Sequence, residues 1–302
     1  LHDALPIWAM TRSRDSVVIK LLRHAQRLQR FLRPVDDLVE LLAPRSSDAM
    51  GPGLICVVGP PRSGTTLTYQ VIRHALVEPY LTNFANLFYS IPSLTLRLSL
   101  ALCARSASSF QSTHGFVPGI CGEAEGLRFW EYWLGQTLQD REENLNYKDG
   151  RTLARKLAIA GIDTMVCGYL GHAFCMNALR SVFPKVLFVH VQRDLLSNAY
   201  SLYRYTGGRL GSIVPRGLAE DPPGDPGRLM IEQIEAIHDR IREQSVETDT
   251  VRVEYSDLCR APNHTAKKIA LAARKLGMNV RLPVRTVQPF APSVVDPTRD
   301  EL

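Results

Sequence analysis

The sequence predicts an α/β fold in three layers, with a central parallel sheet covered by helices on both faces. Two continuous apolar runs, Leu54–Val58 and Val186–Val191, have the length and composition of strands buried on both faces. Each run leads into a segment with helical periodicity, and this alternation of strand and helix is typical of a parallel sheet. The chain has 302 residues, of which 45% are hydrophobic and 22% charged, so one such domain fits its length.

The region before the first strand is predicted to be a helical and linker extension, residues 1–52. Residues 1–9 precede Met10 without any structural pattern and are interpreted as non-native sequence. Ser16–Leu32 is amphipathic, with basic residues opposite its apolar positions. A surface helix packed on the domain is favoured here over a membrane-surface helix, because basic amphipathic helices are common in globular proteins.

The main domain is predicted to span residues 53–282, followed by an irregular, proline-rich tail over residues 283–302. Its third strand is Thr250–Val253, and the aromatic residues between Glu125 and Leu138 are assigned to the core. Helices are expected at Thr65–Val77, Glu125–Leu138, Thr152–Ile159, Leu195–Tyr205, Arg228–Gln244 and from a cap at Asn263 to Lys275. Loops or turns are expected at Arg45–Gly53, Ser106–Gly122, Leu145–Gly150 and Gly207–Gly227, the last being long enough for a lid.

A glycine-rich turn follows the first strand in the stretch GPPRSGTT, residues 59–66. The spacing from Gly59 to Gly64 matches the phosphate loop of nucleotide-binding proteins, but Thr65 stands where that loop has lysine. Arg62 lies inside the turn instead, and the second strand runs into Arg193 where a metal-holding acid would be expected. These residues indicate an anion held by cations, hydroxyls and backbone N–H groups, without a metal ion.

Both segments resemble the sulfotransferases that use 3′-phosphoadenosine 5′-phosphosulfate (PAPS). The family's 5′-phosphosulfate loop, [KR]-x-G-T-T, corresponds to Arg62-Ser63-Gly64-Thr65-Thr66, which gives the fold its P-loop-like strand–loop–helix. An Arg at a strand end, with a Ser eight residues later, holds the 3′-phosphate in this family, and Arg193 and Ser201 have that spacing. The stretch VEYSDLCRAP, with Tyr255 as a candidate neighbour of the adenine, completes a resemblance over about residues 53–277.

The resemblance is closer to divergent bacterial members than to cytosolic animal ones. Leu67 replaces the aromatic residue that follows the loop threonines in the animal enzymes, and their C-terminal R-K-G segment is absent from this sequence. It implies an enzyme that moves a sulfuryl group from PAPS to a hydroxyl or amine of a carbohydrate, lipid or small-molecule acceptor. The product is 3′,5′-adenosine bisphosphate (PAP), and no metal is required.

The resemblance implies two catalytic roles. Arg62 is the candidate for stabilising charge on the leaving phosphate. Glu125, Glu123 and His114 compete as the base for the acceptor, with Glu125 ranked first. Two alternatives remain: a P-loop kinase or NTPase with a displaced basic residue, and a non-catalytic module that binds a nucleotide or glycan.

Composition limits the remaining possibilities. The net charge of +6 suits an anionic ligand, but the basic residues do not form the aromatic-interleaved runs typical of nucleic-acid binding. The six cysteines show no metal-ligand spacing and are interpreted as buried, reduced thiols. With neither a signal peptide nor a transmembrane stretch in the sequence, a cytoplasmic location is expected. The acceptor's identity and the oligomeric state cannot be read from the sequence.

Overall fold

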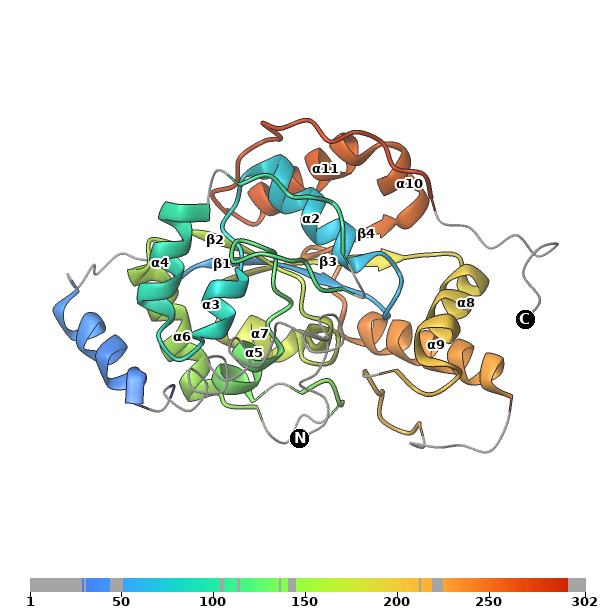
Figure 1. The fold of residues 1–302 in the computed structure, drawn as a ribbon, viewed down its shortest axis with the longest axis horizontal. Coiled ribbons are helices and arrows are strands. Elements are labelled where there is room, and N and C mark those ends of the chain that lie inside the picture. The colour runs from blue at the N-terminus through green and yellow to red at the C-terminus, as the bar shows by residue number, and fades with distance from the viewer. Residues whose placement is uncertain are drawn as a thin grey trace, which may run out of the picture.

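Four parallel strands form one sheet in the computed structural model, in the order β2-β1-β3-β4 (Figure 1). The strands are β1 (Gly53–Val58), β2 (Thr164–Cys167), β3 (Lys185–Gln192) and β4 (Thr250–Glu254). The structure describes residue 29 and residues 31–43, 51–103, 106–112, 115–135, 137–140, 145–211, 213–218 and 225–292. Parallel strands end at the same edge of a sheet, so the residues that follow β1, β2 and β3 lie near one another.

Helices cover both faces of the sheet, as the apolar strands predict (Figure 1). Successive side chains of β1 point to opposite faces of the sheet and pack into two apolar cores. Leu54 packs with the cluster that includes α5, α6 and α7, whereas Ile55 packs with α2 and α11. The first set is α5 (Leu127–Leu134), α6 (Tyr147–Ile159), α7 (Met176–Val182) and α9 (Pro226–Gln244). The second set is α2 (Thr65–Leu76), α10 (Tyr255–Arg260) and α11 (Pro262–Lys275).

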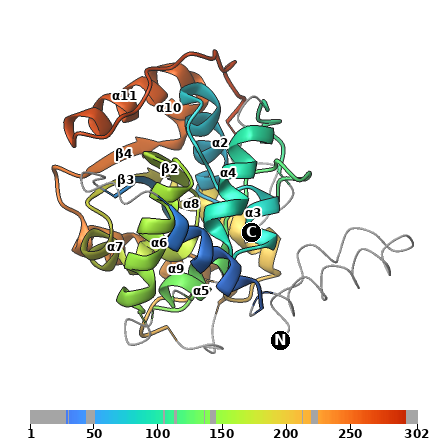
Figure 2. The ribbon, with the colours of Figure 1, turned by 90° about the vertical axis from the view of Figure 1, so that its left-hand side faces the viewer.

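The remaining elements flank this central sandwich. Helix α8 (Leu195–Thr206) packs on α9 and shares a small apolar cluster with it. Helices α3 (Asn83–Leu87) and α4 (Pro92–Cys103) lie on the β2 side, and η2 (Leu170–Phe174) follows β2. A further helix over residues 31–42, named the N-terminal helix below, lies beside α4 and α6 (Figure 2).

Several predicted elements differ in the structure. The strand β2 is missing from the prediction, because its four residues are too few to show a period. The predicted helix Glu125–Leu138 shortens to α5, since Gly126 and Gly135 bound it with left-handed backbone. Its aromatic residues are buried, as predicted. The predicted turn at Leu145–Gly150 largely belongs to α6, which Asn146 caps.

Asn263 does not cap α11. The cap residue is Ala261, and Asn263 instead exchanges two hydrogen bonds with the backbone of Val287, which attaches the following segment to the helix. Ser16–Leu32 lies almost wholly outside the described residues, and so does His114. Among the helices that the structure describes, none has the length and apolar character needed to cross a membrane.

Two of the six cysteines contradict the prediction of reduced thiols. Cys103, at the end of α4, forms a disulfide with Cys121, whose Cα atom lies 5.4 Å away. The other four cysteines are buried and form no disulfide in the part of the chain that the structure describes. The prediction is wrong for this pair because neither spacing nor composition shows that the loop after α4 returns to its end.

Candidate functional site

The turn after β1 has the backbone shape of an anion-binding loop. A Cβ atom added to Gly59 would lie 2.9 Å from both the Ser63 hydroxyl and the Val191 carbonyl, so no side chain fits there. Gly64 has a φ of 99° and caps α2 without any side-chain hydrogen bond. The first N–H groups of α2 have no partner within the helix and point toward the loop, as in phosphate-binding helices.

Arg62 sits in the loop with left-handed backbone, at φ 66°. That conformation costs a non-glycine residue roughly 1–2 kcal/mol, so the surroundings must hold it. They do so from two sides: Arg193 donates from Nη1 to the Arg62 carbonyl at 2.8 Å, and Asn198 donates to the Pro61 carbonyl at 2.9 Å. The loop is thus tied to the end of β3 and to α8.

The two predicted phosphate-binding segments meet in the structure. Nε of Arg62 donates to the hydroxyl of Ser201 at 3.3 Å, across 139 residues of sequence. Burial, aided by the neighbouring Arg62, lowers the pKa of Arg193 despite the opposing effect of Tyr255. Because Arg193 contacts the backbone of Arg62, the site carries two positive charges, and such a site favours an anion.

Hydroxyl and aromatic groups line the same place. Ser63 is fully buried, and its hydroxyl has no hydrogen-bond partner among the described residues. The Tyr255 ring lies 4.9 Å from the Arg193 guanidinium, and a Cβ atom on Gly64 would come within 2.4 Å of this ring. These residues, together with Arg62, Arg193 and Ser201, are named the cradle below. The cradle combines a buried hydroxyl donor at Ser63, a glycine at position 64 and the aromatic ring of Tyr255, which fits a phosphate or sulfate ester.

Asp194 has a structural role beside this cradle. Its carboxylate caps α8 by accepting from the Ser197 N–H at 2.8 Å, and hydrogen bonds from the Ser197 side chain and N–H lower the pKa of Asp194. Within the described residues, no cluster of three or more His, Cys, Asp or Glu side chains is arranged to hold a metal ion.

Glu125 lies next to the loop. It precedes the Gly126 cap of α5, and the adjacent Ala124 N–H binds the Leu81 carbonyl at 2.8 Å. A Cβ atom on Gly115 would be 2.7 Å from Oε1 of Glu125 and 3.8 Å from the Thr66 hydroxyl. Burial raises the pKa of this carboxyl to about 7, which suits a general base.

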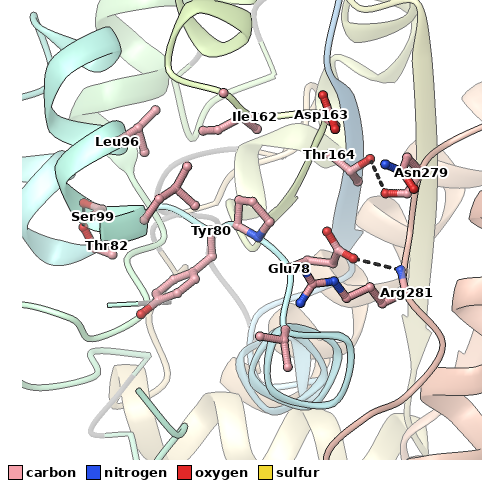
Figure 3. Close-up of a pocket in the computed structure, with 14 residues that line it drawn as sticks. Glu78, Tyr80, Thr82, Leu96, Ser99, Ile162, Asp163, Thr164, Asn279 and Arg281 are labelled. Atoms are coloured by element: carbon pink, nitrogen blue, oxygen red, sulfur yellow. Dashed lines mark hydrogen bonds between the residues drawn. The ribbon is translucent and has the colours of Figure 1, made fainter. Parts of the chain in front are cut away.

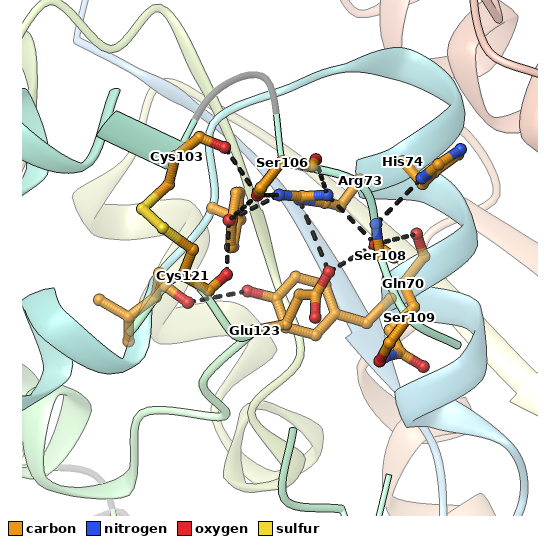
Figure 4. Close-up of polar contacts among 12 residues, drawn as sticks. Gln70, Arg73, His74, Cys103, Ser106, Ser108, Ser109, Cys121 and Glu123 are labelled. Carbon is orange, nitrogen blue, oxygen red and sulfur yellow. Dashed lines mark hydrogen bonds and ion pairs between the residues drawn. A yellow bond between two sulfur atoms is a disulfide. The ribbon is translucent and has the colours of Figure 1, made fainter. Parts of the chain in front are cut away.

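Glu123 is engaged in a buried polar network with α2 (Figure 4). Its carboxylate lies 3.6 Å from Nε of Arg73, with both side chains 3% exposed, and it accepts from Ser108 at 2.5 Å. Arg73 also donates to Ser106 and to the hydroxyl of Tyr80. The network and the Cys103–Cys121 disulfide attach the described parts of the loop 106–122 to the domain, which favours a structural role for Glu123.

We therefore expect the main effect of Glu123→Ala to be a loss of folding stability. Removing one partner of a buried ion pair costs about 3–5 kcal/mol, because the remaining charge is left uncompensated. Thermal unfolding measures this loss, with the exposed Glu131→Ala of α5 as the control. A Glu123→Ala protein that melts like the unaltered chain but has lost its activity would instead assign Glu123 a catalytic role.

Two contacts of the loop escaped the sequence analysis. Asn198 donates to the Pro61 carbonyl, although it lies between Arg193 and Ser201 in the sequence. The Tyr205 ring, 5.7 Å from the Arg62 guanidinium, lies one turn after Ser201 on α8. The i+4 spacing from Ser201 was the available signal for Tyr205, whereas nothing in the sequence pairs Asn198 with a proline carbonyl.

A separate cavity of about 300 Å³ opens at the opposite edge of the sheet (Figure 3). Asp163 and Thr164, at the start of β2, line it together with Glu78 and Arg281. Glu78 accepts from the Arg281 backbone N–H at 3.0 Å, and burial raises the pKa of its carboxyl. Because this cavity is at the amino ends of the strands, it does not belong to the site around the loop.

Comparison with known proteins gives one family match. A profile described as "Sulfotransferase family" matches residues 52–274. No curated protein matches the chain significantly.

Several solved structures align with this chain, among them three sulfotransferases. Sulfotransferase STF9 from Mycobacterium avium aligns at a TM-score of 0.53 and 18% identity, over 85% of this chain and 71% of that one. Sulfotransferase STF1 from Mycobacterium tuberculosis H37Rv aligns at 0.46 and 17% identity, over 84% of this chain and 77% of that one. The sulfotransferase domain from the curacin biosynthetic pathway aligns at 0.45 and 16% identity, over 80% and 76%. At such identities the likeness to STF9 supports the fold alone.

Proposed function

Because the chain belongs to the sulfotransferase family, we propose that it transfers a sulfuryl group from PAPS to a hydroxyl or amine of an acceptor. The acceptor is a carbohydrate, a lipid or a small molecule. The observation that carries the proposal is the meeting of two cationic positions, where Arg62 binds Ser201 and Arg193 binds the Arg62 carbonyl. A donor with two separate anionic groups needs two such positions, whereas a nucleoside triphosphate needs one continuous loop.

The proposal assigns a role to each part of the cradle. Arg62, Ser63, Gly64, Thr65 and Thr66 hold the 5′-phosphosulfate, and Arg193 with Ser201 holds the 3′-phosphate. Tyr255, which lies between Gly64 and Arg193, is the candidate neighbour of the adenine. When bound, PAPS supplies the sulfuryl group, and the chain's residues supply position and charge.

The chemistry then requires two groups. Arg62 stabilises the negative charge that gathers on the leaving 5′-phosphate. Glu125 takes the proton of the acceptor as the acceptor atom bonds to sulfur, and its raised pKa makes it a base suited to neutral pH. Glu123 and His114 stay alternatives for this role. The proposed reaction needs no metal ion.

Binding of PAP tests the proposal without knowledge of the acceptor. PAP at a hundred times its dissociation constant should stabilise the folded chain by about 2.7 kcal/mol, which raises the melting temperature measurably. Arg193→Ala should remove most of this shift, because it deletes the cation proposed for the 3′-phosphate. Arg204→Ala, an exposed arginine on the same helix as Ser201, is the matched control and should keep the shift.

The same measurement separates the alternatives. A shift with Mg²⁺·ATP and none with PAP would replace the proposal by a P-loop kinase or NTPase. A shift with PAP, but no sulfate transfer to any member of a broad acceptor panel, would favour a non-catalytic binding module.

The proposal includes a cytoplasmic location and no nucleic-acid partner. The Cys103–Cys121 disulfide bears on the location, because disulfides in the cytosol are usually transient or redox-sensing. Alkylation of free thiols at the moment of cell lysis would detect this pair as thiols in a reducing compartment. Complete protection of both cysteines would argue for an oxidising one.

A further inference from the structure

The N-terminal helix (residues 31–42) is attached to the domain by its charged face. Arg33 pairs with Asp149 of α6 at 2.8 Å. Asp36 accepts from the Ser93 hydroxyl at 3.1 Å and from the Leu94 N–H at 3.3 Å, both in the first turn of α4. Polar contacts of this kind normally occupy the solvent side of a surface helix.

A buried lysine holds this face in place. Lys156 of α6 is fully buried and lies 3.0 Å from Asp36, 2.8 Å from Asp37 and 3.2 Å from Glu40. Burial opposes its charge, but the hydrogen bonds that Lys156 donates to Asp37 and Asp36 outweigh burial and raise the pKa of Lys156. The cation thus stays charged inside, and the helix cannot turn about its axis without leaving Lys156 unpaired.

The apolar side of the helix therefore faces outward. Phe31, Val35, Leu38 and Leu42 recur at the spacing of one helix face, and they are 69%, 49%, 53% and 75% exposed. This is the reverse of an ordinary surface helix, whose apolar stripe packs on the core.

Helix α4 extends this surface. Leu94, Leu98 and Leu102 are exposed on α4, which lies beside the N-terminal helix (Figure 2). Eight of the seventeen large hydrophobic side chains that are exposed among the described residues lie on these two helices, named here the apolar face: Phe31, Val35, Leu38, Leu41, Leu42, Leu94, Leu98 and Leu102. Exposed apolar side chains that gather in one place indicate an interaction surface, whereas single exposed ones scattered over a protein are ordinary.

Charge indicates which partner covers the apolar face. The 15 residues from Ser16 to Arg30 contain four basic side chains and no acidic one. A second copy of the chain would bring the same positive charge against itself, whereas an anionic lipid headgroup layer complements it. Arg97 is exposed on α4 between Leu94 and Leu98, where a long cationic side chain can reach headgroups while the leucines enter the acyl boundary.

We propose that the apolar face docks the protein on an anionic lipid surface. The two helices lie in the interface with their leucines inserted, and the preceding basic sequence adds electrostatic attraction. This inference does not rest on the transfer reaction, and its test does not use activity.

Co-sedimentation with vesicles tests it on the full chain. The chain should sediment with vesicles of phosphatidylcholine and phosphatidylglycerol, more weakly with phosphatidylcholine alone, and less as salt is added. The variant with Leu38, Leu42, Leu98 and Leu102 each changed to Ser should partition about 100-fold less, because apolar burial at the interface is lost. Leu271→Ser, at an exposed leucine of α11, is the matched control and should bind like the unaltered chain.

Three outcomes would overturn the proposal. The first is an unaltered chain that binds neither kind of vesicle, which would mean that another part of the chain covers the face. The second is full retention of binding by the four-leucine variant, which would assign the attraction to the basic sequence alone. The third is a dimer in light scattering that the same four substitutions dissociate, which would make the face an interface between two copies.

Discussion

Arg62→Ala is expected to lower the rate of sulfuryl transfer about 10³-fold, by analogy with the arginines that stabilise charge in phosphoryl transfer. Arg62 is the basic side chain of the loop itself, and its Nε lies 3.3 Å from the Ser201 hydroxyl. The substitution removes the guanidinium, but it keeps the loop carbonyl to which Arg193 donates. The fold should therefore persist, and the loss should appear in turnover measured with saturating PAPS.

Two further variants give this experiment its control and its contrast. Arg62→Lys keeps the charge but loses the planar fork, so it should recover only part of the rate. Arg204→Ala removes an exposed arginine of α8 and should leave the rate unchanged. Unchanged turnover in Arg62→Ala, with the protein folded, would remove the proposed role of this residue.

Glu125→Gln is expected to lower the rate about 10²- to 10⁴-fold, the range for loss of a general base. The pH profile identifies the cause. The base works when deprotonated, and its pKa is about 7, so kcat/KM of the unaltered chain should rise with pH up to about that value and then level off. Glu125→Gln should abolish this rise, because glutamine does not titrate.

Stability gives an independent check on Glu125. The folded-state pKa is raised to about 7, so the folded state loses stability relative to the unfolded state as pH rises from the ordinary carboxyl pKa to about 7, and the loss is complete above that pH. Below the ordinary carboxyl pKa both states are protonated, and this loss disappears. Glu125→Gln should therefore stabilise the protein more at pH 8 than at pH 4, as measured by thermal unfolding.

One control and two further candidates complete the search for the base. The control is Glu131→Gln, on the exposed side of α5, which should change neither rate nor stability. Glu123→Gln and His114→Asn should be assayed beside Glu125→Gln. If Glu123→Gln, His114→Asn and Glu125→Gln all retain the rate, the base lies elsewhere in the chain.

The candidate anion loop stands out in the sequence because its signals are local, and its binding role stays a prediction. A phosphate loop needs a glycine turn, donors at fixed spacing and a following helix, and all of these occur between Val58 and Leu76. The strands β1, β3 and β4 were visible for a similar reason, since apolar runs between turns reflect burial on both faces.

Long-range contacts set the limit of prediction. Nothing local distinguishes Glu123 from Glu125, yet one pairs with Arg73 while the other lies by Gly115 and the loop. Those environments are created by segments that come together only on folding, and burial then gives two carboxylates different chemistry. The disulfide between Cys103 and Cys121 has the same origin.

The sequence by itself determined the parallel α/β architecture and located the two basic residues of the candidate anion site, because backbone pattern and residue type suffice for both. Only the tertiary structure decided that Arg62 meets Ser201 and that Asn198 supports the loop. It also decided that the helix of residues 31–42 turns its leucines outward. The sequence of this helix shows an apolar and a charged face, but it does not show which face packs on the domain. The charged face packs inward because its acidic side chains pair with the buried Lys156, and a buried charge must keep its partners.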